Sequence, residues 1–138
     1  MPQVIDIQKE MDTCTFLEGR HVDTPPEELE AAFATLANYR DGGIFAGGFS
    51  GFSRWERHRT GDEIVHVLSG ATRLTIMSQS ETETFELTAG MMIIVPQGCW
   101  HRFESETGVR LMTVTPQPTD HTGEDDPNET ARNPSVGT

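Results

Sequence analysis

The spacing of apolar side chains divides the chain into a helical segment, a long region of strands and turns, and a polar end. Apolar residues recur at the helical period at Leu29, Ala32, Phe33, Leu36 and Ala37. Thr24 can cap this segment, Pro25 and Pro26 suit a first helical turn, and Asp41-Gly42-Gly43 stops it. We therefore predict one helix between Thr24 and Asp41, preceded by extended residues 1–22 with one or two short strands.

Residues 44–115 read as short strands separated by glycine or proline turns. Leu74 and Ile76 would face one side of a strand, while Arg73 and Thr75 would face the other. The run from Met91 to Val95 is apolar throughout, which predicts a strand buried on both faces. Many short strands with frequent turns predict an all-β sandwich or barrel, with residues 1–43 packed on it.

The character of the chain changes after Thr115. Residues 116–138 contain a single branched aliphatic side chain and no aromatic one. Such a segment cannot bury enough apolar surface to offset its ordering entropy. We therefore expect an acidic tail that is disordered or wraps the surface, with His121 in solvent.

Length and charge narrow the classes of function. The chain has 138 residues and a net charge of −12, which predicts one domain and disfavours nucleic acid and anionic membranes as partners. No run approaches the roughly 20 apolar residues of a membrane span, and the N-terminus lacks the pattern of a signal peptide. We expect a cytoplasmic protein in which Cys14 and Cys99 are free thiols.

The candidate chemistry lies in two short segments, which supply Glu56, His58, Glu63 and His101. Imidazole and carboxylate ligands suit a transition metal with open positions, whereas a structural zinc knuckle would need thiolates. Glu56 and His58 are two apart, so they point to one face of a strand, whereas His66 points away from the face of Glu63. The competing interpretation is a polar surface cluster with no metal.

The spacing of these residues resembles the two motifs of the cupin superfamily. In the first motif, the matching positions are Gly51, His58, Glu63 and Gly70. In the second, they are Gly90, Pro96, Gly98 and His101. The resemblance implies a double-stranded β-helix, or jelly-roll barrel, with one N-terminal helix outside it, and a homodimer.

The chain departs from the family pattern at Glu56, where the first histidine of the family's pair is expected. The resemblance then implies His58, Glu63 and His101 as metal ligands, with Glu56 either a fourth ligand or a nearby base. Asp62 could replace Glu63 as the ligand, but the spacing to Gly70 favours Glu63. Two histidines and one carboxylate are the ligand class of mononuclear non-haem iron.

By resemblance, the chain is a metal-dependent protein that binds a small organic substrate and oxidises it with oxygen, as a dioxygenase does. Fe(II) or Mn(II) is favoured, with Zn(II) or Ni(II) as alternatives. Glu56 would take a proton, and Arg54 would hold negative charge on the substrate or pair with Glu56. The alternatives are a metal-dependent isomerase, lyase or decarboxylase, and a barrel that binds a ligand without catalysis.

Overall fold

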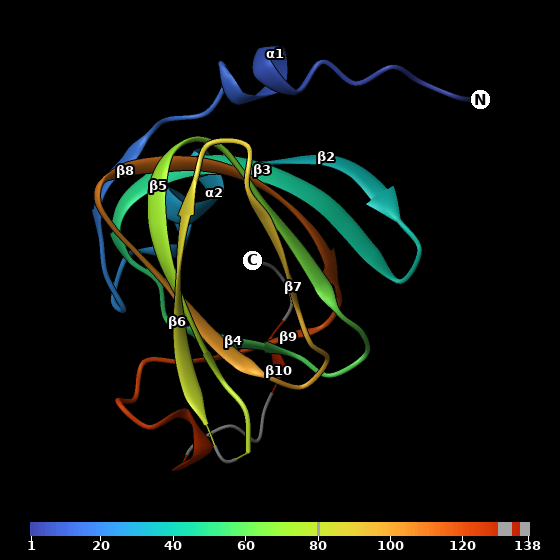
Figure 1. Cartoon of the computed structure of the whole chain (residues 1–138). Coiled ribbons are helices and arrows are strands. Elements are labelled where there is room, and N and C mark those ends of the chain that lie inside the picture. Colours follow the sequence, from blue (N-terminus) through green and yellow to red (C-terminus); the bar gives the residue numbers. More distant parts are fainter. Residues whose placement is uncertain (80, 130–133, 136–138) are drawn as a thin grey trace.

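Strands wound around a common interior make up most of the chain in this computed structural model, which describes residues 1–79, 81–129 and 134–135 (Figure 1). The helices are α1 (Ile7–Met11), α2 (Pro26–Ala32) and the short 3-10 helix η1 (Pro127–Glu129). The strands are β1 (Leu17–Arg20), β2 (Phe33–Tyr39), β3 (Gly42–Phe52), β4 (Trp55–His58), β5 (Glu63–Met77), β6 (Thr82–Thr88), β7 (Met92–Val95), β8 (Trp100–Pro116), β9 (Thr119–Thr122) and β10 (Pro134–Ser135).

The long strand β8 organises the barrel. It pairs antiparallel with β3 and β4 on one side and with β5 on the other. β2 extends the sheet beyond β3, and β6 and β7 both pair with β5. α1 lies outside the barrel, at the end opposite to β4, β9 and β10 (Figure 1). The predicted all-β barrel is confirmed, because nearly every element is a strand and the helices are short.

The period-two pattern of β5 points every second side chain into the barrel. Glu63, Val65 and Val67 are all buried, and so are Leu74 and Ile76 in the second half of the strand. The aromatic core continues from Phe33 and Phe49 to Phe103. The interior is therefore apolar along most of its length and becomes polar where β5 begins.

The predicted helix is only half correct. α2 ends at Ala32, and Phe33–Tyr39 instead forms β2, which pairs along β3. The turn at Asp41, predicted to end the helix, closes this hairpin. Pairing with β3 satisfies the backbone and brings the Phe33 ring to Phe49, and such tertiary contacts override weak helical periodicity. Thr24 does not cap α2 and instead accepts a hydrogen bond from the His21 N–H.

Two further predictions for local structure are wrong. β7 is not buried on both faces, since Met92 and Ile94 are more than half exposed and only Val95 is fully buried. Residues 7–11, predicted to be extended, form α1, in which the Asp6 carboxylate accepts from the Lys9 N–H as an N-cap.

The beginning of the predicted tail is an ordered part of the sheet. Residues 119–122 form β9, which pairs with β4, and Asp120 is only 1% exposed. The Asp120 carboxylate accepts from Arg57 Nε at 2.8 Å and lies 3.0 Å from Arg59 Nε. Composition missed this strand because ion pairs and threonine hydroxyls, rather than apolar side chains, hold it in place. Residues 130–133 and 136–138 of the predicted tail lie outside the described residues.

No helix in the described part of the chain is long and apolar enough to cross a membrane. Cys14 and Cys99 are unpaired thiols.

Asp120→Ala should lower the free energy of unfolding by about 2 kcal/mol, because it leaves the guanidinium groups of Arg57 and Arg59 without their shared acceptor. Asp125→Ala, at an exposed acidic position of the same segment, serves as the matched control and should be neutral. Urea unfolding of both variants checks this. Equal stability of the two variants would show that β9 is not anchored by its carboxylate.

Candidate metal centre

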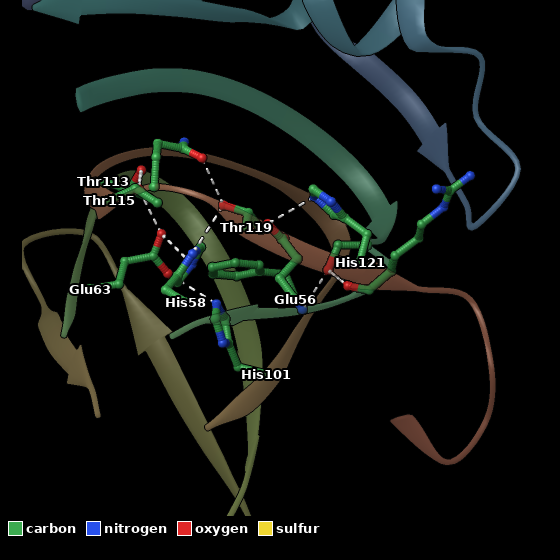
Figure 2. Close-up of polar contacts among 12 residues, drawn as sticks. Glu56, His58, Glu63, His101, Thr113, Thr115, Thr119 and His121 are labelled. Atoms are coloured by element: carbon green, nitrogen blue, oxygen red, sulfur yellow. Dashed lines mark hydrogen bonds and ion pairs between the residues drawn. The ribbon is translucent and has the colours of Figure 1, made fainter. Parts of the chain in front are cut away.

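Three strands bring His58, Glu63 and His101 together inside the barrel. His58 ends β4, Glu63 begins β5, and His101 is the second residue of β8. The pairing of β4 with β8 places Glu56 beside His101, and the strand alternation then turns His58 to the same interior. Figure 2 shows the side chains of His58, Glu63 and His101 turned toward one another.

The three side chains form a tight cluster that is closed to solvent. One potential ligand atom from each lies within 4.8 Å of the others. His101 Nε2 is 3.0 Å from Glu63 Oε1, and His58 Nε2 is 3.3 Å from Glu63 Oε2. The residues are 0%, 2% and 4% exposed for His101, His58 and Glu63 respectively. The competing interpretation, a polar cluster on the surface, is therefore wrong for these three.

Hydrogen bonds behind the cluster hold each imidazole in one orientation. His101 Nδ1 lies 3.1 Å from the carbonyl oxygen of Cys99, which can only accept, so Nδ1 carries the proton. His58 Nδ1 lies 3.0 Å from the hydroxyl of Thr119, which in turn donates to Gln117. A hydroxyl that donates to Gln117 accepts from His58, so both histidines carry a proton on Nδ1 and turn Nε2 toward the interior.

Threonines orient the carboxylate in the same way. Thr115 Oγ1 donates to Glu63 Oε2 at 2.7 Å and lies 2.8 Å from Thr113 Oγ1. Such contacts behind the ligands are typical of metal sites, where they fix ligand direction and basicity. Both threonines lie on β8, so the strand that carries His101 also orients Glu63.

The donor atoms that face the centre are unsatisfied by protein. Among the described residues, His58 Nε2, His101 Nε2 and Glu63 Oε1 are buried and make no well-aligned hydrogen bond, and their ion-pair contacts are confined to the cluster itself. A buried polar atom without a partner is costly, and here three of them face the same point. A divalent transition metal would satisfy all three, and the donor set of two imidazoles and one carboxylate fits such an ion. The cluster therefore suggests a metal ion.

Burial and charge pull the pKa values of the cluster in opposite directions. Burial raises the pKa of Glu63, but the imidazoles of His101 and His58 outweigh it and hold that pKa well below the ordinary 4.5. Burial lowers the pKa of His101, but the Glu63 carboxylate outweighs it and raises that pKa above 6.5. Without a metal, the site therefore favours a carboxylate beside an imidazolium.

The other predicted site residues lie beside the cluster. Glu56 is buried, but its carboxylate is not among the atoms that converge with those of His58, Glu63 and His101. It lies instead 3.7 Å from His121 Nε2. Arg54 is exposed and donates from Nε to the Val22 carbonyl at 2.6 Å. Ligation by Glu56 and a substrate-binding role for Arg54 stay predictions.

Sequence reasoning missed three residues around the site. His121 was expected in solvent, yet β9 pairs with β4 so that His121 lies opposite Glu56. Thr119, from the same strand, supports His58. Arg20, from β1, lies buried beside the aromatic core. No local motif marks them, because each reaches the site through strand pairing between distant segments.

Two cavities lie beside this region, and Arg20, Phe33 and Phe45 line both of them. A small one, of about 20 Å³, is lined by Glu63, Glu56, Arg20 and residues of the aromatic core. A larger one, of about 470 Å³, is lined by Arg20, Arg54, His121 and segments of β1, α2 and β2. The larger volume lies within the usual range for small-molecule sites.

Comparison with known proteins identifies the fold family. The model of the cupin domain family matches residues 45–115, which is just over half of the chain. The chain belongs to the cupin family.

Part of this chain is similar in sequence to a dioxygenase, and its fold is similar to those of two solved structures. It is 33% identical over 63 residues to an acireductone dioxygenase from Rhodopseudomonas palustris, covering 46% of this chain but only 38% of that enzyme. A cupin-2 domain protein from Shewanella frigidimarina superposes with a TM-score of 0.50 at 24% identity, over 62% of this chain and 80% of that one. A hydroquinone 1,2-dioxygenase from Sphingomonas sp. TTNP3 gives a TM-score of 0.55 at 13% identity, over 71% and 80% of the two chains. The structural likenesses show the shared fold.

His101→Gln should abolish stoichiometric metal binding, because it removes one of three converging ligands. The loss of affinity should exceed the ~10–100-fold cost of changing a residue behind the ligands. His66→Gln changes a half-buried histidine on the opposite face of β5 and should leave the metal content intact. Elemental analysis after metal loading, with circular dichroism as a check on folding, measures both. Full metal content in folded His101→Gln would rule out this site.

The stabilisation by metal should grow as pH rises from 5.5 to 8. In metal-free protein, the lowered pKa of Glu63 stabilises the folded state fully above pH 4.5, so this contribution stays constant between pH 5.5 and 8. The raised pKa of His101 stabilises the folded state fully below pH 6.5, and this contribution is lost as the pH rises through the folded-state pKa. The metal must displace the proton of the imidazolium, and that displacement costs less as pH rises. Melting temperatures with and without chelator at each pH test this. A difference that stays constant or shrinks with rising pH would contradict it.

Proposed function

We propose that this cupin binds a divalent metal at His58, Glu63 and His101 and uses it to oxidise a small organic substrate with molecular oxygen. One observation carries the proposal: two imidazole Nε2 atoms and one carboxylate oxygen converge inside the barrel and make no well-aligned hydrogen bond to protein. Two histidines and a carboxylate with open positions are the ligand set of non-haem iron oxygenases. The partial likeness to acireductone dioxygenase supports the same class.

The metal, for which Fe(II) or Mn(II) is proposed, would supply Lewis acidity and redox chemistry when bound. The protein's own residues would do the remaining work. Thr115 and Thr119 orient the ligands through their hydroxyls. The buried aromatic core next to His101 excludes water from one side of the site. The larger cavity would admit the substrate past Arg54, whose guanidinium can hold negative charge at the entrance.

Glu56 is proposed as the group that takes a proton from the substrate. It lines the inner cavity with Glu63, and that cavity of about 20 Å³ has room for about one water molecule, which could carry a proton between Glu56 and a substrate in the larger cavity. His121, 3.7 Å away, can pass a proton on toward the larger cavity, which it also lines. A dimer, which would be the family's usual assembly, stays a proposal alongside this function.

Oxygen uptake tests the proposed reaction. The protein would be loaded with Fe(II), Mn(II) or Zn(II) and supplied with a hydroquinone or an acireductone, the substrates that the names of its relatives suggest. We expect oxygen consumption with Fe(II) or Mn(II) and none with Zn(II) or without metal. Turnover under argon with Zn(II) would favour an isomerase or lyase instead. Tight binding without turnover would favour a ligand-binding barrel.

Glu56→Gln should retain the metal but lose roughly 100-fold or more in kcat, the usual contribution of a general base. The substitution keeps the size of the side chain and removes its ability to accept a proton. Glu83→Gln, at an exposed position of β6, is the control. Elemental analysis and steady-state kinetics separate the two roles. A fall in metal content comparable to that of His101→Gln would make Glu56 a ligand instead.

A further inference from the structure

Arg20 is a buried arginine whose guanidinium makes no hydrogen bond or ion pair within the described chain. The residue is 7% exposed and lies on β1. Its guanidinium carbon lies 4.7 Å from the centroid of the Phe49 ring and 5.4 Å from that of Phe33. Stacking on these rings holds the plane of the guanidinium but leaves its N–H donors unused.

Arg20 lies next to two cavities, where a ligand could accept hydrogen bonds from its unused donors. Arg20 lines both the inner cavity, which it shares with Glu56 and Glu63, and the larger outer cavity. It therefore lies at the boundary between the two. A buried charge without a hydrogen-bonded counter-charge is costly to maintain, and the nearest acid that acts on it, Glu56, attracts it only through space while lying against His121.

The charges that line the outer cavity are opposite in sign to those of the whole chain. The cavity is lined by two arginines, Arg20 and Arg54, but by a single carboxylate, Glu30. Two histidines, His21 and His121, also line it. The net charge of the whole chain is −12. Most of the remaining lining residues are apolar side chains of α2, β2 and β3, joined by Val22 and by the hydroxyls of Thr24 and Thr35. The cavity therefore suits a ligand with an apolar body and a negative end.

The fold holds the backbone of Arg20 firmly in this place. Arg20 pairs with Gly51 of β3, which has a φ of +95°. A β-carbon at Gly51 would collide with the backbone oxygen and nitrogen of Arg20. The glycine that opens the first cupin motif is thus what allows β1 to bring an arginine to the cavity.

We propose that Arg20 binds the carboxylate of a small organic monoanion, which is the substrate of the proposed function. A planar guanidinium can donate two parallel hydrogen bonds to a carboxylate. The anion's apolar body would lie along Phe33 and Phe45 of the outer cavity. The inference names a substrate class for the proposed oxidation and rests on that proposal only in calling the anion a substrate.

The test compares carboxylic acids with their amides by calorimetry. Phenylacetate and hexanoate are each titrated against phenylacetamide and hexanamide, in protein as purified and after chelation. We expect each acid to bind at least 10-fold more tightly than its amide in both preparations. Arg20→Gln should remove this preference and Arg20→Lys should keep part of it, since an ammonium group cannot donate in the two-pronged manner. Acids that bind no better than their amides would overturn the proposal. A preference for acids that survives Arg20→Gln but disappears on chelation would also overturn it, because the metal and not Arg20 would then bind the carboxylate.

The control is Arg110→Gln. Arg110 also stacks on a ring, 4.9 Å from the centroid of Phe16, but it is exposed and lines neither cavity. Its loss should leave the preference for acids unchanged.

One measurement avoids variants that fail to fold. In native protein, the Nε–H resonance of Arg20 should shift on addition of phenylacetate and not of phenylacetamide. An unshifted resonance at saturation would overturn the proposal. Because none of these measurements uses oxygen, acid binding without turnover would remove only the proposed oxidation, and turnover of a neutral substrate without acid preference would remove only the role of Arg20.

Discussion

The structure depends on one unusual arrangement, the burial of three polar side chains whose free atoms face each other. His58, Glu63 and His101 lie inside a barrel whose core is mostly apolar, and their inward atoms make no well-aligned hydrogen bond and contact only one another. Without a counter-ion, each such atom would cost about 1–3 kcal/mol. The hydrogen bonds with Cys99, Thr119 and Thr115 hold the three side chains in orientations that keep these atoms facing inward. A bound metal ion would satisfy all three atoms at once.

Strand β9 is part of this centre rather than an appendage. β9 covers β4 and supplies both Thr119, which supports His58, and His121, which lies against Glu56. Its anchor is the buried Asp120 with the guanidinium groups of Arg57 and Arg59. The same short strand therefore links stability, the orientation of a ligand and the proposed path of a proton.

The sequence predicts the barrel and the central residues well for identifiable reasons. Period-two alternation is visible in β5, and the glycines that bound the first motif, Gly51 and Gly70, have positive φ where the register of β3 and β5 shifts. The positions of His58, Glu63 and His101 follow from these local patterns. The prediction was wrong for the second half of the helix, because a short segment such as 33–39 is compatible with both the helical and the strand period of apolar residues. Pairing with β3 makes this segment a strand.

β9 and Arg20 could not be predicted from local pattern. Polar residues such as Thr119 and Asp120 become buried only because strand β4, distant in sequence, supplies partners for them. Arg20 lies outside both motifs, and its importance arises from parallel pairing with β3 and from contact with two aromatic rings. Apart from the contact between Arg20 and Phe33, these features depend on contacts between segments more than 25 residues apart, which composition and periodicity do not report.

Anomalous diffraction from crystals grown with Mn(II) or Fe(II) tests the central claim most directly. The account predicts one strong peak inside the barrel, about 2.0–2.2 Å from His58 Nε2, His101 Nε2 and an oxygen of Glu63, the usual range for such ligands. No peak there, with the three side chains hydrogen-bonded to one another or to water, would contradict it.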